Sequence, residues 1–160
     1  MNRKSGFTLI ELLVVIAIIG VLAGVLMVAL TTSRQRGADA AKIGSVREVR
    51  TAINQYFNDN GVYPVGQFAT GVTNLTTALV PKYISSIDAN IKYQSMNSDQ
   101  TACASNCASY HLGIPLTRTD NSVLKVDGDI VSGNFDGTKD NCTAGSVTAS
   151  IPDLCYDLIP

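Results

Sequence analysis

Glu11 is the residue whose position most strongly implies chemistry. From Phe7 to Leu30 the sequence is apolar over 24 residues, and Glu11 is the only charged residue in that stretch. A carboxylate so deep in an apolar segment is costly, so it needs a partner, a task, or access to water near the lipid headgroups. The spacing alone leaves these three interpretations open.

The second group of reactive residues is a set of four cysteines in the distal part of the chain: Cys103, Cys107, Cys142 and Cys155. An even number of cysteines in a small domain beyond a membrane-type segment predicts disulfide bonds in an oxidising compartment. Three pairings are open. We prefer Cys103–Cys107 with Cys142–Cys155, because the second pair closes a polar C-terminal loop that could not hold itself by core burial. Reduced, buried cysteines are the alternative.

The third group is acidic, with four aspartates within fourteen residues: Asp127, Asp129, Asp136 and Asp140. Oxygen ligands suit Ca²⁺, but the spacing does not match an EF-hand loop. We therefore predict solvated turns and no cofactor, with calcium as the alternative. No set of residues typical of an active site occurs, and the single histidine, His111, fits a strand better than a catalytic base. An enzyme is not predicted.

The elements that must position these residues begin with a membrane-length helix. Residues 7–30 would span about 36 Å as a helix, enough to cross a hydrocarbon core of about 30 Å. No second apolar run reaches that length. Arg3 and Lys4 should stay on the cytoplasmic side, which places the C-terminal part outside the membrane. The net charge of −1 gives no reason to expect nucleic acid.

The helix should continue beyond the apolar segment as an amphipathic stalk to Asn58 and end at Asp59-Asn60-Gly61. A short helix is expected at residues 74–79, with Leu75, Leu79 and Val80 facing the stalk. Short strands are predicted at His111–Leu116, Val123–Val126, Ile130–Ser132 and Val147–Ile151. Asp127-Gly128 is expected to close a two-residue hairpin, and Asp136-Gly137 is a second turn. The economical fold class is α+β, a small antiparallel sheet packed on the distal half of the long helix.

The N-terminal block Gly6-Phe7-Thr8-Leu9-Ile10-Glu11, preceded by Arg3-Lys4, resembles the signature of type IV pilins and type II secretion pseudopilins. Gly61-Val62-Tyr63-Pro64 is similar to a turn found in many of these proteins. The resemblance implies that a prepilin peptidase cuts between Gly6 and Phe7 and methylates the new amine of Phe7. It also implies that Glu11 pairs with the Phe7 amine of a neighbouring subunit.

The resulting division of the chain is a leader at 1–6, a membrane and filament-core helix at 7–30, a stalk helix at 31–60 and a globular head at 61–160. The predicted function is a structural subunit of an extracytoplasmic filament. Its partners would be copies of itself, the peptidase, the assembly machinery in the inner membrane, and the lipid bilayer before assembly. The alternatives are a major pseudopilin of type II secretion, and a membrane-tethered domain that never polymerises.

Overall fold

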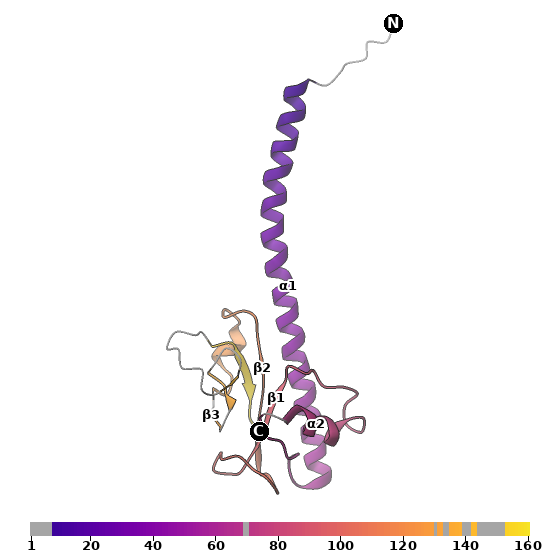
Figure 1. The fold of residues 1–160 in the computed structure, drawn as a ribbon, viewed down its shortest axis with the longest axis vertical. Coiled ribbons are helices and arrows are strands. Elements are labelled where there is room, and N and C mark those ends of the chain that lie inside the picture. The colour runs from indigo at the N-terminus through magenta and orange to yellow at the C-terminus, as the bar shows by residue number, and fades with distance from the viewer. Residues whose placement is uncertain (1–7, 69–70, 130, 133–134, 139–141, 144–152) are drawn as a thin grey trace. The chain divides into compact units, whose positions relative to one another are not determined.

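The computed structural model describes residues 8–68, 71–129, 131–132, 135–138, 142–143 and 153–160 (Figure 1). The chain divides into two compact units, residues 1–37 and 38–160, and the helix α1 (Leu9–Asn60) runs through both. We call residues 38–160 the distal unit. The stalk half of α1 is therefore part of the same compact unit as the globular region that follows it.

The C-terminal end of α1 lies within two residues of the predicted one, Asn58, and falls in the predicted stop signal at residues 59–61. The helix continues to Asn60, and Gly61 adopts a left-handed conformation with φ of 72°. The Gly61 N–H donates to the Phe57 carbonyl at 2.7 Å. Glycine takes this conformation without a side-chain clash, which explains why the helix ends here. The predicted start at Phe7 lies outside the described residues.

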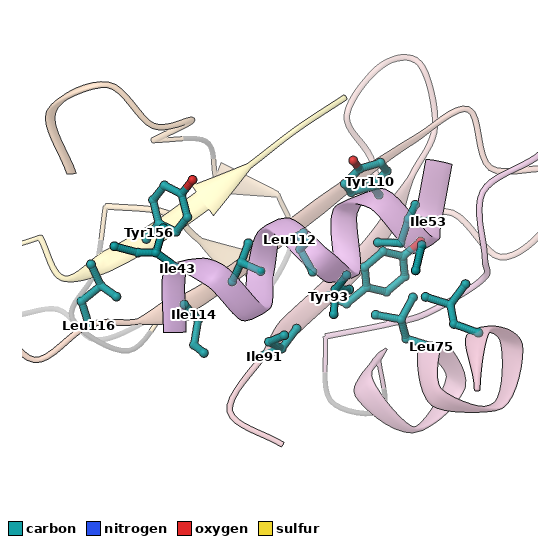
Figure 2. Close-up of a cluster of buried hydrophobic side chains, with 14 of the residues drawn as sticks. Ile43, Ile53, Leu75, Ile91, Tyr93, Tyr110, Leu112, Ile114, Leu116 and Tyr156 are labelled. Atoms are coloured by element: carbon teal, nitrogen blue, oxygen red, sulfur yellow. The ribbon is translucent and has the colours of Figure 1, made fainter. Parts of the chain in front are cut away.

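One face of α1 forms the core of the distal unit (Figure 2). Val46, Val49 and Ile53 are fully buried at three- and four-residue steps, as the amphipathic pattern predicts. They pack with the second helix, α2 (Gly71–Leu79), through Leu75 and Leu79. Val80 was expected on the same face, but it is only partly buried and lies outside this core.

The sheet that covers this face has three antiparallel strands in the order β1-β2-β5. They are β1 (Lys92–Met96), β2 (Ser109–Pro115) and β5 (Cys155–Leu158). A separate two-stranded pair is formed by β3 (Val131–Ser132) and β4 (Phe135–Asp136). The predicted α+β class, a long helix with a small antiparallel sheet, is confirmed.

Two predictions about the segment before β3 are wrong. Residues Val123–Val126 do not form a strand, because Ser122–Lys125 is a single 3-10 turn, η1, with Asn121 as its N-cap. The Asp127-Gly128 pair therefore cannot close a two-residue hairpin. The predicted strand at 147–151 lies outside the described residues. Strands β1, β4 and β5 were not predicted.

Candidate functional site

Glu11 lies in the first turn of α1, where it completes a helix cap with Thr8. The Thr8 backbone N–H and hydroxyl donate to Glu11 Oε2 at 2.8 and 2.7 Å, and the Glu11 N–H donates to Thr8 Oγ1 at 3.3 Å. This reciprocal arrangement is a capping box. In the single chain, the carboxylate is therefore satisfied locally. Gly6 and Phe7, the predicted processing site, lie outside the described residues.

The first half of α1 carries an apolar surface that is exposed in the part of the chain that the structure describes. Large apolar residues from Leu9 to Leu30 are exposed, with Leu9 at 88% and Met27 at 72% exposed. Of the described residues, α1 is the one helix long and apolar enough to cross a membrane. An apolar surface of this extent needs lipid or other protein around it.

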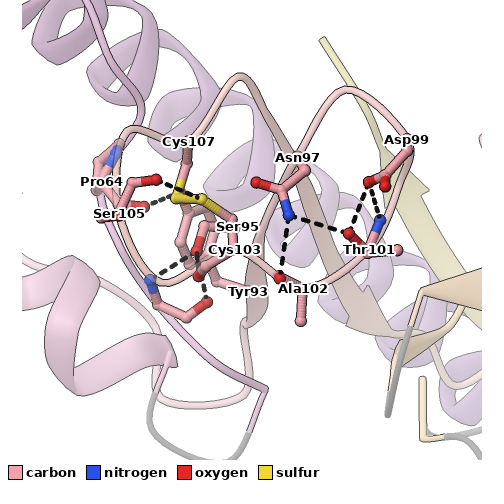
Figure 3. The surroundings of a disulfide bond; sticks show 11 residues. Pro64, Tyr93, Ser95, Asn97, Asp99, Thr101, Ala102, Cys103, Ser105 and Cys107 are labelled. Atoms are coloured by element: carbon pink, nitrogen blue, oxygen red, sulfur yellow. Dashed lines mark hydrogen bonds between the residues drawn. A yellow bond between two sulfur atoms is a disulfide. The ribbon is translucent and has the colours of Figure 1, made fainter.

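The first disulfide lies beside the segment that follows α1, next to Pro64 (Figure 3). Cys103 and Cys107 are bonded, as predicted, and close a five-residue loop. Hydrogen bonds hold the loop against two other segments. The Tyr63 N–H donates to the Cys107 carbonyl at 3.1 Å, and the Ser95 hydroxyl donates to the Cys103 carbonyl at 3.0 Å. The disulfide therefore fixes the turn after α1 to strand β1.

The second disulfide, Cys142–Cys155, also matches the preferred pairing. It joins the segment after β4 to the first residue of β5. Both cysteines are fully buried and pack with Phe135 in a second, smaller apolar cluster. The bond thus attaches the C-terminal strand to the two-stranded pair, which has little core of its own.

His111 is a buried residue of β2 and not an exposed catalytic base. Its Nε2 hydrogen-bonds Asp157 Oδ2 across the sheet, with neither side chain exposed, and its ring stacks on Phe135 at 3.6 Å between centroids. The other oxygen of Asp157 accepts the backbone N–H groups of Gly128 and Asp129 at 3.1 and 3.0 Å. Asp157 therefore links β2, β5 and the loop after η1.

The acidic residues form a different group from the predicted one. Oxygens of Asp127, Asp129 and Asp157 lie within 4.8 Å of one another. Asp136 is not part of this group, because it belongs to β4 and its Oδ1 accepts from the Thr138 N–H and hydroxyl. Asp140 lies outside the described residues. Oxygens from a loop and a neighbouring strand are a donor set of the kind that Ca²⁺ accepts.

The electrostatics of this group are unfavourable for ionised carboxylates. Burial, and then the charge of Asp157, raises the pKa of Asp127 to about 7. Neither carboxylate oxygen of Asp127 has a hydrogen-bond partner among the described residues. Burial and the charge of Asp157 also raise the pKa of Asp129. A proton or a cation would relieve this repulsion.

The sequence analysis did not identify Thr8 or Asp157 as partners of the candidate functional residues. Thr8 could have been found, because Thr-x-x-Glu before an apolar run is the signature of a capping box. Asp157 could not, because its importance depends on β5 pairing with β2, forty-odd residues earlier in the chain.

The chain thus combines an apolar N-terminal helix, capped by Thr8 and Glu11, with a small α+β unit that carries two disulfides. The family described as the prokaryotic N-terminal methylation motif matches residues 1–27. The chain is also 25% identical to the type IV major pilin protein PilE1 of Neisseria gonorrhoeae, over 96% of this chain and 94% of that one.

Two further relatives have a higher identity over a shorter part of the chain. The fimbrial protein EcpC of Eikenella corrodens is 33% identical over 52% of this chain and 53% of its own length. The type II secretion system core protein G of Aeromonas hydrophila is 34% identical over 39% of this chain and 44% of its own. No solved structure gives a significant match. The predicted relationship to type IV pilins and pseudopilins is confirmed.

Proposed function

We propose that this chain is the structural subunit of an extracytoplasmic filament, similar to type IV pilins, and that it polymerises through the first half of α1. The observation that carries the proposal is the exposed apolar surface of a helix that begins inside a matched methylation motif. A pilin relative that aligns over nearly the whole chain supports it. Relatives named as a major pilin and a fimbrial protein support a structural role, and we assign this chain no enzymatic activity.

The proposed pathway starts in the inner membrane. Residues 7–30 would cross the bilayer with Arg3 and Lys4 on the cytoplasmic side and the distal unit outside. A prepilin peptidase would cut between Gly6 and Phe7 and methylate the Phe7 amine. The assembly machinery would then extract the subunit into a filament, where the Phe7 amine of one copy pairs with Glu11 of another.

The test of this proposal is electron microscopy of material sheared from cells that express the chain, with an antibody against the distal unit. We expect labelled filaments in the sheared fraction. Processed protein that stays entirely in the membrane as a single subunit would contradict filament formation and favour a tethered domain.

The second candidate function is that of a major pseudopilin, and two observations favour it. One is the similarity to the type II secretion protein. The other is the group formed by Asp127, Asp129 and Asp157, because the resemblance to major pseudopilins implies a calcium site in this part of the head. If this group binds Ca²⁺, the cation should raise the melting temperature of the chain, and Asp127→Asn should abolish the effect. Long surface filaments without any calcium effect would favour the pilus instead.

A further inference from the structure

A groove of about 280 Å³ lies between the stalk half of α1 and the segment at residues 84–88 of the distal unit. Its lining is mostly polar, and the partly exposed Ile84 and Ile87, with the buried Val49 behind them, form a smaller apolar part. Val49 lies at the edge of the core face of α1, and Ile84 and Ile87 belong to the segment that follows α2. This apolar part can accept an aliphatic chain.

The polar residues that line the groove are acidic or neutral: Ser45, Glu48, Ser86 and Asp88. No basic residue lines it. Asp88 uses one oxygen, Oδ1, to accept both the backbone N–H and the side-chain amide of Asn90 at 2.8 Å. Glu48 is exposed and has no ion pair among the described residues. Two carboxylates beside this smaller apolar part suit an arginine side chain, which has an aliphatic stem and a cationic end.

Cations that could fill this groove are found on α1 itself. Lys82 and Arg118 are already paired with Asp59 and Asp120, and Lys42 donates to the Pro115 carbonyl at 2.7 Å. Arg34, Arg36 and Lys125 are exposed, and none of them forms an ion pair with any described residue. Lys125 lies in η1, whereas Arg34 and Arg36 lie on α1, the helix of the proposed filament contact. Arg47 is also exposed, but it adjoins Glu48 on the same helix and is part of the groove's own surroundings.

We propose that this groove binds an arginine of the segment 34–36 from a second copy of the chain. The inference rests on the proposed function, because a filament packed through α1 brings this segment of one copy against the stalk of another. Residues two apart on a helix point about 200° apart, so a given neighbour meets only one of the two arginines. The contact would fix the register between copies as well as adding attraction.

The test is a charge swap measured as the ratio of sheared filament to processed, membrane-bound subunit. Glu48→Arg places like charges together and should lower this ratio about tenfold. Combining it with either Arg34→Glu or Arg36→Glu should restore most of the ratio in one of the two double variants. Lys125→Glu, a charge reversal at an exposed residue outside the groove, is the matched control and should leave the ratio unchanged.

The proposal is wrong if Glu48→Arg assembles like the wild type, or if neither double variant recovers. If Glu48→Arg is protease-sensitive and therefore misfolded, cysteine cross-linking tests the contact instead. Ser86→Cys combined with Arg34→Cys or Arg36→Cys should give disulfide-linked dimers in assembled filaments for one combination, and no dimers for either would overturn the proposal. Absence of filaments from the wild type would contradict the proposed function itself.

Discussion

At the scale of single residues, Asp127 carries the clearest electrostatic cost in the distal unit. Its pKa is raised to about 7, mainly by burial, whereas an unfolded aspartate titrates near 3.9. Between these values the folded chain holds a proton that the unfolded chain has lost. The contribution of Asp127 to stability is therefore full below about pH 4 and is lost as the pH rises through about 7.

This sign can be tested with Asp127→Asn, which keeps the shape and removes the titration. We expect the free energy of unfolding of the variant, relative to the wild type, to increase between pH 5 and pH 8. The measurement is urea unfolding of the detergent-solubilised chain in the presence of a chelator. The difference cancels carboxylates that do not interact with Asp127, including Asp59 and Asp99, whose pKa values are lowered by hydrogen bonds. A difference that does not change with pH would contradict the assignment.

Gly113 is the second residue at which the structure predicts a definite effect of substitution on stability. A Cβ atom added there would lie 2.8 Å from the ring of Phe135 and 2.9 Å from the Tyr156 carbonyl oxygen. Gly113→Ala should therefore lower the free energy of unfolding by about 1–3 kcal/mol. Gly44→Ala is the matched control, because a Cβ there meets nothing within 4 Å, and it should raise stability by up to about 1 kcal/mol. Equal effects in urea unfolding would contradict this packing.

At the scale of elements, the two disulfides should differ in what they stabilise. Cys142 and Cys155 are 13 residues apart, whereas Cys103 and Cys107 are 4 apart. In the chain-entropy account, the longer loop contributes about 3 kcal/mol and the shorter one about 2 kcal/mol. Replacing Cys142 and Cys155 with serine should make β5 and the two-stranded pair protease-sensitive while the apolar helix still inserts.

The matched variant replaces Cys103 and Cys107 with serine, and limited proteolysis followed by peptide mapping compares the two. Cleavage should appear near β5 in the first variant and near the turn after α1 in the second. Identical cleavage patterns would contradict separate roles. Mapping without reduction also checks the pairing, since a Cys103–Cys142 cross-link would contradict both assignments.

The elements also show how far the sequence determines the fold. The long helix and its end were predictable, because the apolar periodicity and Gly61 are local signals. Strand β1 was not, because it buries Gln94 and Ser95 and so lacks an apolar pattern. The Val123–Val126 prediction failed because the apolar residues suited a strand while Asn121 capped a 3-10 turn. Asp157 is defined by contacts across the sheet, which no local pattern specifies.

At the scale of the whole molecule, the filament account requires a processed N-terminus. Intact-mass measurement of assembled protein should show loss of residues 1–6 and a gain of one methyl group at Phe7. Gly6→Val should block cleavage, because a branched side chain replaces the residue that has none, and the precursor should accumulate in the membrane. Filaments built from unprocessed chains would contradict this step.

Substitution of Glu11 distinguishes a polymerising subunit from a membrane-tethered domain. In the single chain Thr8 satisfies the Glu11 carboxylate, and glutamine can take the same place in a capping box. Glu11→Gln therefore keeps the local helix start and removes only the charge. In the proposed filament core the Phe7 amine and Glu11 would leave water together, and their attraction would grow as the effective dielectric falls. Without the carboxylate, the amine would be buried unpaired, at a cost of about 3–5 kcal/mol.

The most direct measurement of this account is the ratio of sheared filament to membrane-bound, processed subunit for the wild type, Glu11→Asp and Glu11→Gln. Expression, insertion and Gly6/Phe7 cleavage should be similar in all three. We expect a sharp loss of filament for Glu11→Gln and an intermediate yield for Glu11→Asp, which keeps the charge but shortens its reach. Equal ratios for the wild type and Glu11→Gln would contradict the charge pairing and the main physical reason for regarding this chain as a filament subunit.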